Sequence, residues 1–383
     1  MLNYRSILMR IGINTRFLLK DKLEGIGWFT YEVAKRLVEQ HPEDEFLFFF
    51  DRPYATDFVF AENVQPVVLF PPARHPVLFY IWFEYALARA LKRYKVNVLL
   101  SPDNFCSLQT DVPVVLVIHD LAYAHFPDQL RKRDLWYYRH FMPKFIQKAN
   151  HIVSVSEYTK SDILRKHVTK AEKISVACNG CKSSFRVLSI EEKEAIKRQY
   201  TEGKDYFFYV GAVHPRKNVH RLIAAFNQFK QHTKSDLHLL IAGKWSWQTS
   251  AVKAIYDSSK YAADIHFLGY VSEEQLPKLM GSALALTYVS TFEGFGVPLL
   301  EAMHCEVPVI TSNISSMPEV VGEAALLVDP FQVNSIAKAM ESIYQDKDLV
   351  KELVEKGKTQ REKFSWDKAT DVIYRACKSL IIN

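Results

Sequence analysis

The sequence predicts an α/β protein built from two doubly wound, parallel-sheet domains. Short apolar, β-branched runs alternate with longer segments of helical period along the chain, which is typical of βα units around parallel sheets. With 383 residues, the chain is too long for one ordinary core. A charged stretch at residues 183–203 separates two sets of runs. We therefore expect domains at residues 1–185 and 186–365.

Each apolar run is interpreted as a strand. In the first domain these are residues 10–14, 46–50, 67–70, 96–100, 114–118, 151–155 and 173–176. In the second they are residues 206–210, 238–242, 265–268, 283–288, 307–311 and 325–328. Doubly wound sheets bind ligands outside the carboxyl ends of their strands. We therefore expect both domains to face one cleft that holds the site.

The composition limits the class of protein. Forty-nine basic and 43 acidic residues give a net charge of only +6, so a nucleic-acid partner is not expected. Residues 74–95 and 130–149 are nonetheless rich in Lys, Arg and aromatic residues. Such runs are typical of solvated helix faces, and the alternatives are an anionic acceptor or peripheral contact with an anionic membrane surface.

The cysteines and the apolar segments indicate a cytoplasmic protein. The five cysteines are scattered, which favours a reducing compartment. The pair Cys178 and Cys181 has no second half-motif and is interpreted as incidental. Arg10 and Arg16 interrupt the apolar start of the chain, so no signal peptide is predicted. A helix that spans a bilayer needs about 20 consecutive apolar residues, and the sequence contains no such run.

The stretch STFEGFGVPLLEAM, residues 290–303, raises the main functional question. Glu293 and Glu301 stand around Gly294, Gly296 and Pro298. Glycine and proline disfavour a continuous helix there, whereas proline suits a first helical turn. We expect a loop that leads into a helix, with Glu301 in its first turn. Free amides at a helix start form an anion site, most naturally for phosphate.

Two carboxylates beside a phosphate pocket need a separate explanation. Carboxylates accept hydrogen bonds from sugar hydroxyls, so a phosphate flanked by two hydroxyl-bearing groups indicates a nucleotide sugar. The alternative is that Glu301 only complements the helix dipole and that Glu293 is solvated. Arg216 and Lys217 follow the strand at residues 206–210. They face the same cleft in this interpretation and would stabilise a departing diphosphate.

Two further stretches lie in the first domain. Gly25 and Gly27 precede a helical segment, and we expect a glycine-lined loop that faces the cleft; the pattern departs from the dinucleotide fingerprint. His119 and Asp120 end the strand at residues 114–118. His119 is either a cleft residue or a buried histidine with satisfied hydrogen bonds.

Together these segments resemble the retaining glycosyltransferases of family 4, which have the GT-B architecture of two Rossmann-like domains. The most specific parts are EGFGVPLLEAM, PVITSNISSMPEVVGEAALLVDP and HPRKNVHRLIAAF, and GIGWFTYEVAKRL, VIHDLAYAHFPD and FSWDKA agree as well. Within the family the chain is most similar to mannosyl- and rhamnosyltransferases of bacterial surface polysaccharides. The resemblance implies that a helix at residues 366–383 crosses back to the first domain.

The resemblance also implies roles for donor-binding residues. Glu301 would hold the ribose hydroxyls and Glu293 hydroxyls of the transferred sugar. Backbone amides of the loop would serve the sugar and the phosphate; these belong to Gly294, Phe295, Gly296 and Val297. Val271 falls where the family places the base.

The remaining roles concern the diphosphate and the transferred sugar. Lys217 with Arg216 would bind the diphosphate, His119 would lie near the sugar, and Gly27 beside the phosphates or the acceptor. The chain departs from the family at Glu306, where glycine is usual in a helix-ending turn. It departs again at Ala212, where many members carry arginine.

The implied reaction transfers a hexose with retention from a nucleotide-diphosphate sugar to a glycan or lipid-linked acceptor. This route requires no enzyme nucleophile, and no cofactor is expected. A metal is not expected either, because the single D-x-D match, Asp346-Lys-Asp348, lies in a charged helical segment. The rival hypotheses are a non-catalytic nucleotide-sugar-binding protein and a glycoside hydrolase that uses Glu293 and Glu301.

Overall fold

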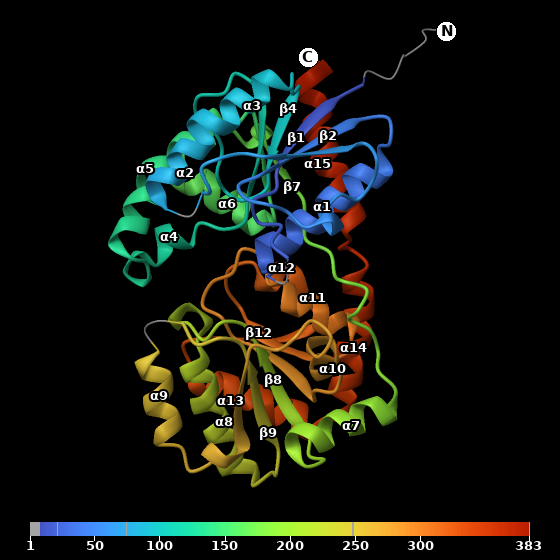
Figure 1. Cartoon of the computed structure of the whole chain (residues 1–383). Helices are drawn as coiled ribbons and strands as arrows, with labels where there is room; N and C mark the ends of the chain where they lie inside the picture. Colours follow the sequence, from blue (N-terminus) through green and yellow to red (C-terminus); the bar gives the residue numbers. More distant parts are fainter. Residues whose placement is uncertain (1–7, 21, 74, 247–248, 383) are drawn as a thin grey trace. The chain divides into compact units, whose positions relative to one another are not determined.

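The computed structural model describes residues 8–20, 22–73, 75–246 and 249–382. The chain divides into two compact units (Figure 1). Unit 1 is Met1–Asn179 with Ser365–Asn383, and unit 2 is Gly180–Phe364. The division lies a few residues before the predicted boundary near residue 185.

Unit 1 is built on a seven-stranded sheet of order β3-β2-β1-β4-β5-β6-β7, in which every pairing is parallel. Its strands are β1 Arg10–Asn14, β2 Glu45–Phe50, β3 Val64–Val68, β4 Val98–Ser101, β5 Val114–Ile118, β6 His151–Ser154 and β7 Ile174–Val176. Its α-helices are α1 Gly25–Gln40, α2 Pro76–Ile81, α3 Ala88–Arg93, α4 Ala122–His125, α5 Lys132–Lys148, α6 Glu157–Lys166 and α15 Trp366–Ile382. Shorter elements are η1 Thr56–Phe58, η2 Trp82–Leu87, η3 Pro127–Gln129 and η4 Ala171–Lys173.

Unit 2 is built on a six-stranded parallel sheet of order β10-β9-β8-β11-β12-β13. Its strands are β8 Tyr206–Val210, β9 His238–Ala242, β10 Ile265–Gly269, β11 Ala285–Tyr288, β12 Val309–Ser312 and β13 Ala325–Val328. Its α-helices are α7 Ile190–Thr201, α8 Val219–Thr233, α9 Ser250–Asp257, α10 Leu276–Gly281, α11 Val297–His304, α12 Met317–Val321, α13 Val333–Gln345 and α14 Lys347–Arg361. Two 3₁₀ turns complete it, η5 Pro215–Lys217 and η6 Ala262–Asp264.

Interior strands of both sheets are buried on both faces. All five residues of β5 and all five of β9 are buried. This is typical of parallel sheets that helices cover on both sides. The architecture confirms the predicted pair of doubly wound, Rossmann-like domains. In each sheet the winding reverses once, between β1 and β4 in unit 1 and between β8 and β11 in unit 2.

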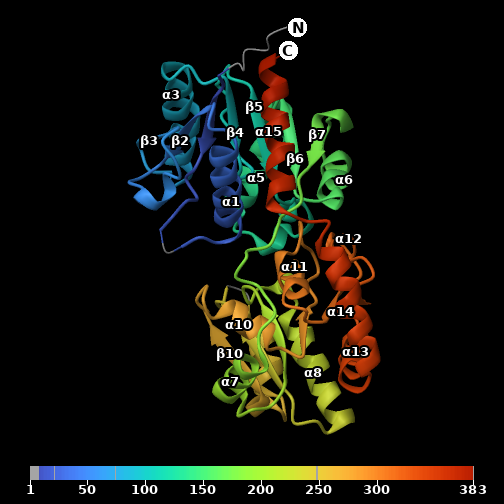
Figure 2. The same ribbon diagram turned by 90° about the vertical axis from the view of Figure 1, so that its right-hand side faces the viewer.

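The C-terminal helix α15 packs on unit 1, as predicted. Figure 2 shows α15 beside α1. The Trp366 ring meets the Phe29 ring edge-on at 5.8 Å. Tyr374 stacks on His41 of the segment after α1, with ring centroids 3.4 Å apart. A helix that begins directly after unit 2 is therefore part of the core of unit 1.

Asp44 links this helix to the segment before β1 through two hydrogen bonds. One carboxylate oxygen accepts a hydrogen bond from the Tyr374 hydroxyl at 2.8 Å, and the other accepts one from the Met9 amide at 2.9 Å. Asp44 also lies close to His41 and Glu43, in an arrangement that could hold a metal ion. Since both oxygens of Asp44 already accept hydrogen bonds, the group is explained by its structural role.

All thirteen predicted strands are present, but several begin elsewhere. β3 begins at Val64 instead of residue 67, and it includes Pro66 opposite Phe48. Proline is tolerated there because β3 lies at the edge of the sheet. β4, β11 and β12 each begin two residues later than predicted.

Candidate active site

The candidate site of unit 2 lies where β8 and β11 meet. These neighbouring strands flank the point at which the winding reverses, and ligands of α/β sheets bind outside the carboxyl ends of strands at such a point. η5 follows β8, and residues 289–296 follow β11. Thr291 joins the two loops, because its amide and its hydroxyl both donate to the Arg216 carbonyl, at 2.8 and 3.0 Å.

Glu293 is the centre of a buried ion cluster formed by these loops. Its Oε1 accepts hydrogen bonds from Lys217 Nζ at 2.6 Å and from the Tyr288 hydroxyl at 2.9 Å. Its Oε2 lies 3.3 Å from a guanidinium nitrogen of Arg216. Lys217 also donates to the Tyr288 oxygen at 2.8 Å. Two cations around one carboxylate leave the cluster with a net charge of +1.

The protonation of Glu293 is set by these partners. Burial opposes ionisation, but the charges of Lys217 and Arg216 and the hydrogen bond from Lys217 outweigh it and lower the pKa of Glu293 to about 2. Glu293 is therefore a carboxylate at physiological pH, which accepts hydrogen bonds and donates none. The sequence placed Arg216, Lys217 and Glu293 in one cleft, and the structure brings their side chains into direct contact.

The glycine loop leads into α11 as predicted. Gly296 precedes the helix with φ 98°, a left-handed conformation that glycine adopts without strain. Val297 begins the helix, Pro298 occupies its first turn, and no side chain caps its start. Pro298 has no amide hydrogen, and the Leu299 amide donates to the Gly296 carbonyl at 3.0 Å. The Val297 amide is therefore the donor that this helix start could offer to an anion.

Two serines that follow β12 fix the shape of this loop. Ser315 accepts a hydrogen bond from the Glu293 amide at 3.0 Å and donates to the Glu293 carbonyl. Ser316 lies 2.9 Å from the carbonyl oxygens of Glu293 and Phe295. The buried Phe295 ring also meets Phe364 edge-on at 5.6 Å. The backbone of residues 293–295 is therefore held from one side by residues that lie about twenty positions later in the chain.

Glu301 differs from its prediction in position and in environment. Since α11 begins at Val297, Glu301 lies in the second helical turn and not in the first. It is only 7% exposed, and within the described part of the chain its carboxylate has no hydrogen-bond or ion-pair partner. Burial raises the pKa of Glu301 to about 7, although the charge of Lys182 acts in the opposite direction. Ionising a carboxylate that is this nearly buried is costly, and a ligand that donates hydrogen bonds would relieve this cost.

Sequence reasoning did not identify Tyr288, Ser315 or Ser316. Tyr288 is the last residue of the buried strand β11, directly before the loop. The sequence could have indicated it as a site residue, because it carries a polar group at the carboxyl end of a strand. The serines lie in the segment TSNISSMPE, directly after the carboxyl end of β12. Their role was not visible, because a serine in a loop has no fixed partner until the neighbouring strand is placed.

Tyr288→Phe is expected to weaken binding of a nucleotide sugar, the ligand that the sequence predicts, and to lower the free energy of unfolding by about 1–3 kcal/mol, because Lys217 and Glu293 each lose a buried partner. Isothermal titration calorimetry and urea denaturation measure the two effects. The matched control is Tyr206→Phe, which removes a buried hydrogen bond to the Leu279 carbonyl outside the site. That variant should lose stability alone. Unchanged affinity for the nucleotide sugar in Tyr288→Phe would contradict a role of Tyr288 in ligand binding.

In unit 1, His119 follows β5 at the carboxyl edge of the sheet, as predicted. Its Nε2 lies 2.8 Å from the Pro102 carbonyl, and its amide donates to Asn104 at 2.8 Å. Burial lowers the pKa of His119, although the Pro102 carbonyl acts in the opposite direction. Because a carbonyl only accepts, the neutral ring carries its proton on Nε2 and offers Nδ1 as an acceptor.

The prediction that Gly27 lies in a loop ahead of the helix was wrong. α1 begins at Gly25, so Gly27 lies in its first turn and is buried. A Cβ atom at this position would come within 2.9 Å of the Phe17 carbonyl oxygen. Glycine is thus explained by close packing of the preceding loop. Phe29, two residues later, packs edge-on against the His119 ring at 4.9 Å, so this turn of α1 neighbours His119.

Val271 follows β10, which lies two strands from β8. The loops after β9 and β10 run together, since the Gly243 amide donates to the Gly269 carbonyl at 2.7 Å. Lys244 Nζ lies 4.6 Å over the Tyr270 ring. The structure does not bring Val271 into the ion cluster around Glu293, and its contact with a base stays a prediction.

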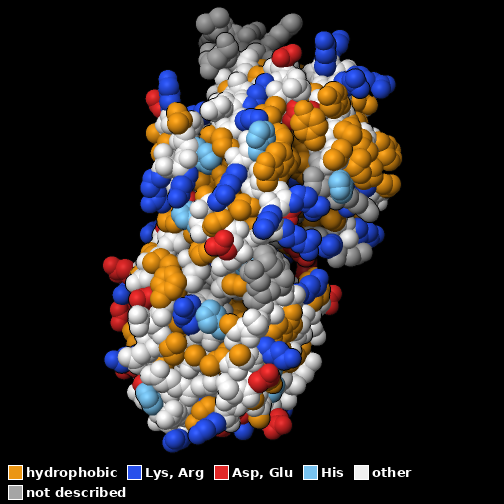
Figure 3. Space-filling model, turned by 90° about the vertical axis from the view of Figure 1, so that its left-hand side faces the viewer, with side chains coloured by type: hydrophobic (Ala, Val, Ile, Leu, Met, Phe, Trp, Pro, Cys, Tyr) orange, Lys and Arg blue, Asp and Glu red, His pale blue; other side chains and the backbone are white. Residues whose placement is uncertain are grey.

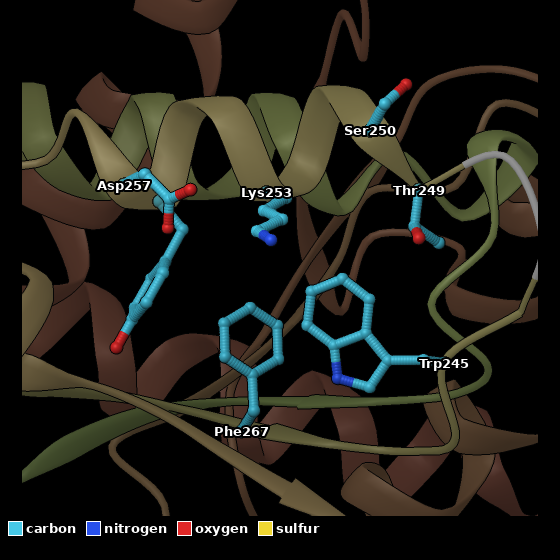
Figure 4. Close-up of a pocket in the computed structure, with 7 residues that line it drawn as sticks. Trp245, Thr249, Ser250, Lys253, Asp257 and Phe267 are labelled. Atoms are coloured by element: carbon cyan, nitrogen blue, oxygen red, sulfur yellow. The ribbon is translucent and has the colours of Figure 1, made fainter.

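A mainly apolar cavity of about 380 Å³ lies between α9 and β10. Figure 4 shows the Trp245 and Phe267 rings side by side below α9, and their centroids are 4.8 Å apart. The remaining lining residues are Thr249, Ser250, Lys253, Tyr256 and Asp257. None of the predicted site residues lines this cavity.

The departures from the family pattern have local structural consequences. Glu306 lies in the turn after α11 with φ 55°, the left-handed conformation for which glycine is favoured. Asp346 of the D-x-D match accepts hydrogen bonds from the amides of Asp348 and Leu349 at the start of α14. The match is therefore a helix cap, as its place in a charged helical segment suggested.

Two family models match the chain. The model described as Glycosyltransferase Family 4 matches residues 23–184, and the model described as Glycosyl transferases group 1 matches residues 191–360. The first match lies in unit 1 except for its last five residues, 180–184, and the second lies in unit 2.

Individual proteins are also similar. The O-antigen chain mannosyltransferase B of Escherichia coli is 28% identical over 373 residues, which cover 94% of this chain and 98% of that protein. Sucrose-phosphate synthase from Thermosynechococcus elongatus shares the fold with a TM-score of 0.78 and 17% identity, covering 98% of this chain and 99% of that one. Anabaena HepE, solved in complex with UDP and glucose, has a TM-score of 0.74 and 17% identity over 97% of this chain and 100% of that one.

Proposed function

Because the chain belongs to the glycosyltransferases that combine a family 4 domain with a group 1 domain, we propose that it transfers a hexose, mannose or a related sugar, from a nucleotide-diphosphate sugar. The acceptor is a glycan or a lipid-linked glycan of a cell-surface polysaccharide. Mannose is favoured because the similar E. coli protein is an O-antigen chain mannosyltransferase.

The observation that carries this proposal is the positive ion cluster at the start of α11. Arg216 and Lys217 exceed the charge of Glu293 by one, and the amides at the start of α11 have no side-chain cap. A diphosphate placed there would meet lysine, arginine and the Val297 amide of the helix start together. These groups stabilise the charge that develops on the leaving nucleoside diphosphate.

The two glutamates have different roles in this proposal. Glu301 is a nearly buried acceptor with no partner in the described part of the chain, and ribose hydroxyls would donate hydrogen bonds to it. Both oxygens of Glu293 are engaged by Lys217, Tyr288 and Arg216. Glu293 therefore positions Lys217, and its remaining acceptor capacity is available to hydroxyls of the transferred sugar. In unit 1 the neutral His119 ring offers Nδ1 as an acceptor, and its contact with the transferred sugar stays a prediction.

We further propose that transfer proceeds with retention and without a metal ion. In such a reaction the acceptor hydroxyl attacks from the face that the diphosphate leaves, and no carboxylate has to form a bond to the sugar. The engagement of both Glu293 oxygens supports this route. The chain's own cations and amides would bind the diphosphate charge that a metal ion binds in other transferases.

One observation favours a glycoside hydrolase as the second candidate. The pKa values of Glu293 and Glu301 are pushed apart to about 2 and about 7, and a general acid beside an ionised carboxylate is the pattern of such enzymes. Against it, a nucleophilic Glu293 would have to leave two cations and a tyrosine hydroxyl. The family match and the uncapped helix start also favour a transferase.

The test is a donor screen with GDP-, UDP- and dTDP-sugars, in which thermal shift reports binding and release of nucleoside diphosphate reports turnover. We expect one donor class to bind and to turn over with a polysaccharide acceptor, with the same anomeric configuration in the product by NMR. The rate should be unchanged by EDTA. Cleavage of simple glycosides without nucleotide would favour the hydrolase, and binding with no turnover would indicate a sensor.

A further inference from the structure

Helices α2 and α5 of unit 1, together with η2, present large hydrophobic side chains to solvent. Trp136 is 61% exposed, Val77 59%, Tyr85 48% and Tyr80 38%. The four rings form one patch, because Tyr80 lies 6.3 Å from both Tyr85 and Phe141, and Trp136 lies 6.2 Å from Phe141. Val77 precedes Tyr80 by three residues on α2, which places both on one side of the helix. We name these five residues the aromatic surface.

Basic residues surround the aromatic surface. Residues 75–95 and 131–148 contain ten Lys or Arg and two acids, a net charge of +8, whereas the whole chain has +6. The remaining residues together are therefore at −2. Of the two acids, Glu84 is buried and accepts hydrogen bonds from the amides of Leu108 and Gln109. The other, Asp134, lies 3.3 Å from Arg133.

The exposed charges lie on the same helix face as the exposed ring of Trp136. Along α5 the exposed side chains are Lys132, Arg133, Trp136, Arg139, His140, Lys144 and Gln147. Their spacing of three or four residues places most of them on one side of the helix. Figure 3 shows hydrophobic side chains next to lysine and arginine side chains over unit 1. The face thus combines an apolar centre with a cationic rim.

We propose that the aromatic surface docks unit 1 peripherally on a bilayer that contains anionic lipid. Trp and Tyr rings with an apolar body and a polar tip are favoured at the headgroup level of a membrane. Lysine and arginine near such a surface gain about 1 kcal/mol each. No helix in the described part of the chain is long and apolar enough to cross a membrane.

The charge distribution also orients the protein. An anionic bilayer attracts residues 75–95 and 131–148, which have a net charge of +8. It does not attract the rest of the chain, whose net charge is −2. Single-stranded nucleic acid combines basic and aromatic contacts as well, but its bases stack in a groove that tracks the strand. Here the rings stand on exposed faces of two helices. A lipid surface fits this arrangement better, and the inference is independent of the donor chemistry in unit 2.

The test is co-sedimentation of the full chain with vesicles of phosphatidylcholine alone or with about one-third phosphatidylglycerol. We expect binding only to the anionic vesicles and weaker binding at higher salt. The double variant Arg139→Gln and Lys144→Gln should bind about 30-fold more weakly, at about fivefold per charge. The matched control is Lys351→Gln with Lys356→Gln on α14 of unit 2, which should bind like wild type.

Brominated lipid tests the ring contact directly. It should quench Trp136 fluorescence, and Trp136→Phe should lose this quenching, whereas Trp245→Phe, with a 45% exposed ring in unit 2, should keep it. Far-UV circular dichroism confirms that each variant is folded. Equal binding to neutral and anionic vesicles would overturn the proposal. Salt-sensitive binding to an oligonucleotide without lipid binding, or a dimer lost in Trp136→Ala, would overturn it as well.

Discussion

Lys217→Ala is expected to slow sugar transfer about 10²–10³-fold, because one preorganised cation at a developing diphosphate charge has about this effect. Lys217 lies 2.6 Å from Glu293 and 2.8 Å from the Tyr288 oxygen, so its ammonium is fixed before the donor arrives. The rate at saturating donor, measured by release of nucleoside diphosphate, tests this expectation. The control is Lys351→Ala, which changes an exposed surface ion pair and should leave the rate unchanged.

The same variant also leaves Glu293 buried with one cation fewer, which is expected to cost about 3–5 kcal/mol of stability. A second variant separates the two effects. The pair Lys217→Met and Glu293→Gln removes both charges, so it should recover much of the free energy of unfolding in urea. It should not recover the rate. A double variant that is stable and as active as wild type would contradict the role of Lys217 in transfer.

The sequence was sufficient for the architecture around this cluster because the strands carry an unmistakable pattern. β8 and β11 are runs of apolar residues that end directly before charged or glycine-rich segments. Since parallel strands of a doubly wound sheet present their carboxyl ends at one edge, Arg216, Lys217 and Glu293 could be assigned to one edge. Which side chains meet was not predictable, because it depends on the register between β8 and β11 and on the conformations of two loops.

The strand starts show a second limit. Val96 and Val307 are apolar and β-branched, yet their amides donate to the carbonyls of Leu91 and Ala302 in the preceding helices. Each follows a residue with positive φ, Lys95 at 52° and Glu306 at 55°. A helix-ending turn with glycine at that position would have been recognisable. Lys95 gives no such signal, and at Glu306 only the resemblance to the family indicated the turn, so both predicted strands began too early.

Gly27 shows a third limit. Its pattern with Gly25 suggested an open loop near a ligand, but the structure explains it by the Phe17 carbonyl, which approaches too closely for a side chain. Glycine serves both purposes, and the sequence contains no signal that distinguishes them. Whether a glycine lies in an open loop or under a close backbone contact depends on a neighbouring segment, whose position is known only in the folded chain.

Glu301→Gln is expected to weaken donor binding about 10- to 100-fold, because a hydroxyl that binds a carboxylate loses a charge-assisted hydrogen bond. Burial raises the pKa of Glu301 to about 7 in the free protein. If the ionised form binds the donor, affinity should decrease below pH 7 by up to about tenfold per pH unit. The intact nucleotide sugar is the suitable ligand, since a diphosphate without the sugar titrates in this range itself. Calorimetry at pH 6, 7 and 8 should show the slope in wild type and lose it in Glu301→Gln.

The same substitution should stabilise the free protein, which separates the role of Glu301 in binding from a role in folding. Its pKa is higher in the folded state than the unperturbed value of 4.5, so the folded state holds its proton to higher pH than the unfolded chain does. Wild-type stability therefore decreases as the pH rises from about 4.5 to about 7 and stays lower above it. Glu301→Gln removes this penalty, so its gain over wild type in urea denaturation should be largest at pH 8 and small at pH 4.5. Glu355→Gln, at a 69% exposed side chain, is the control for both measurements. If Glu301→Gln is less stable than wild type at pH 8, or binds the donor as wild type does, Glu301 does not bind the hydroxyls of a ligand.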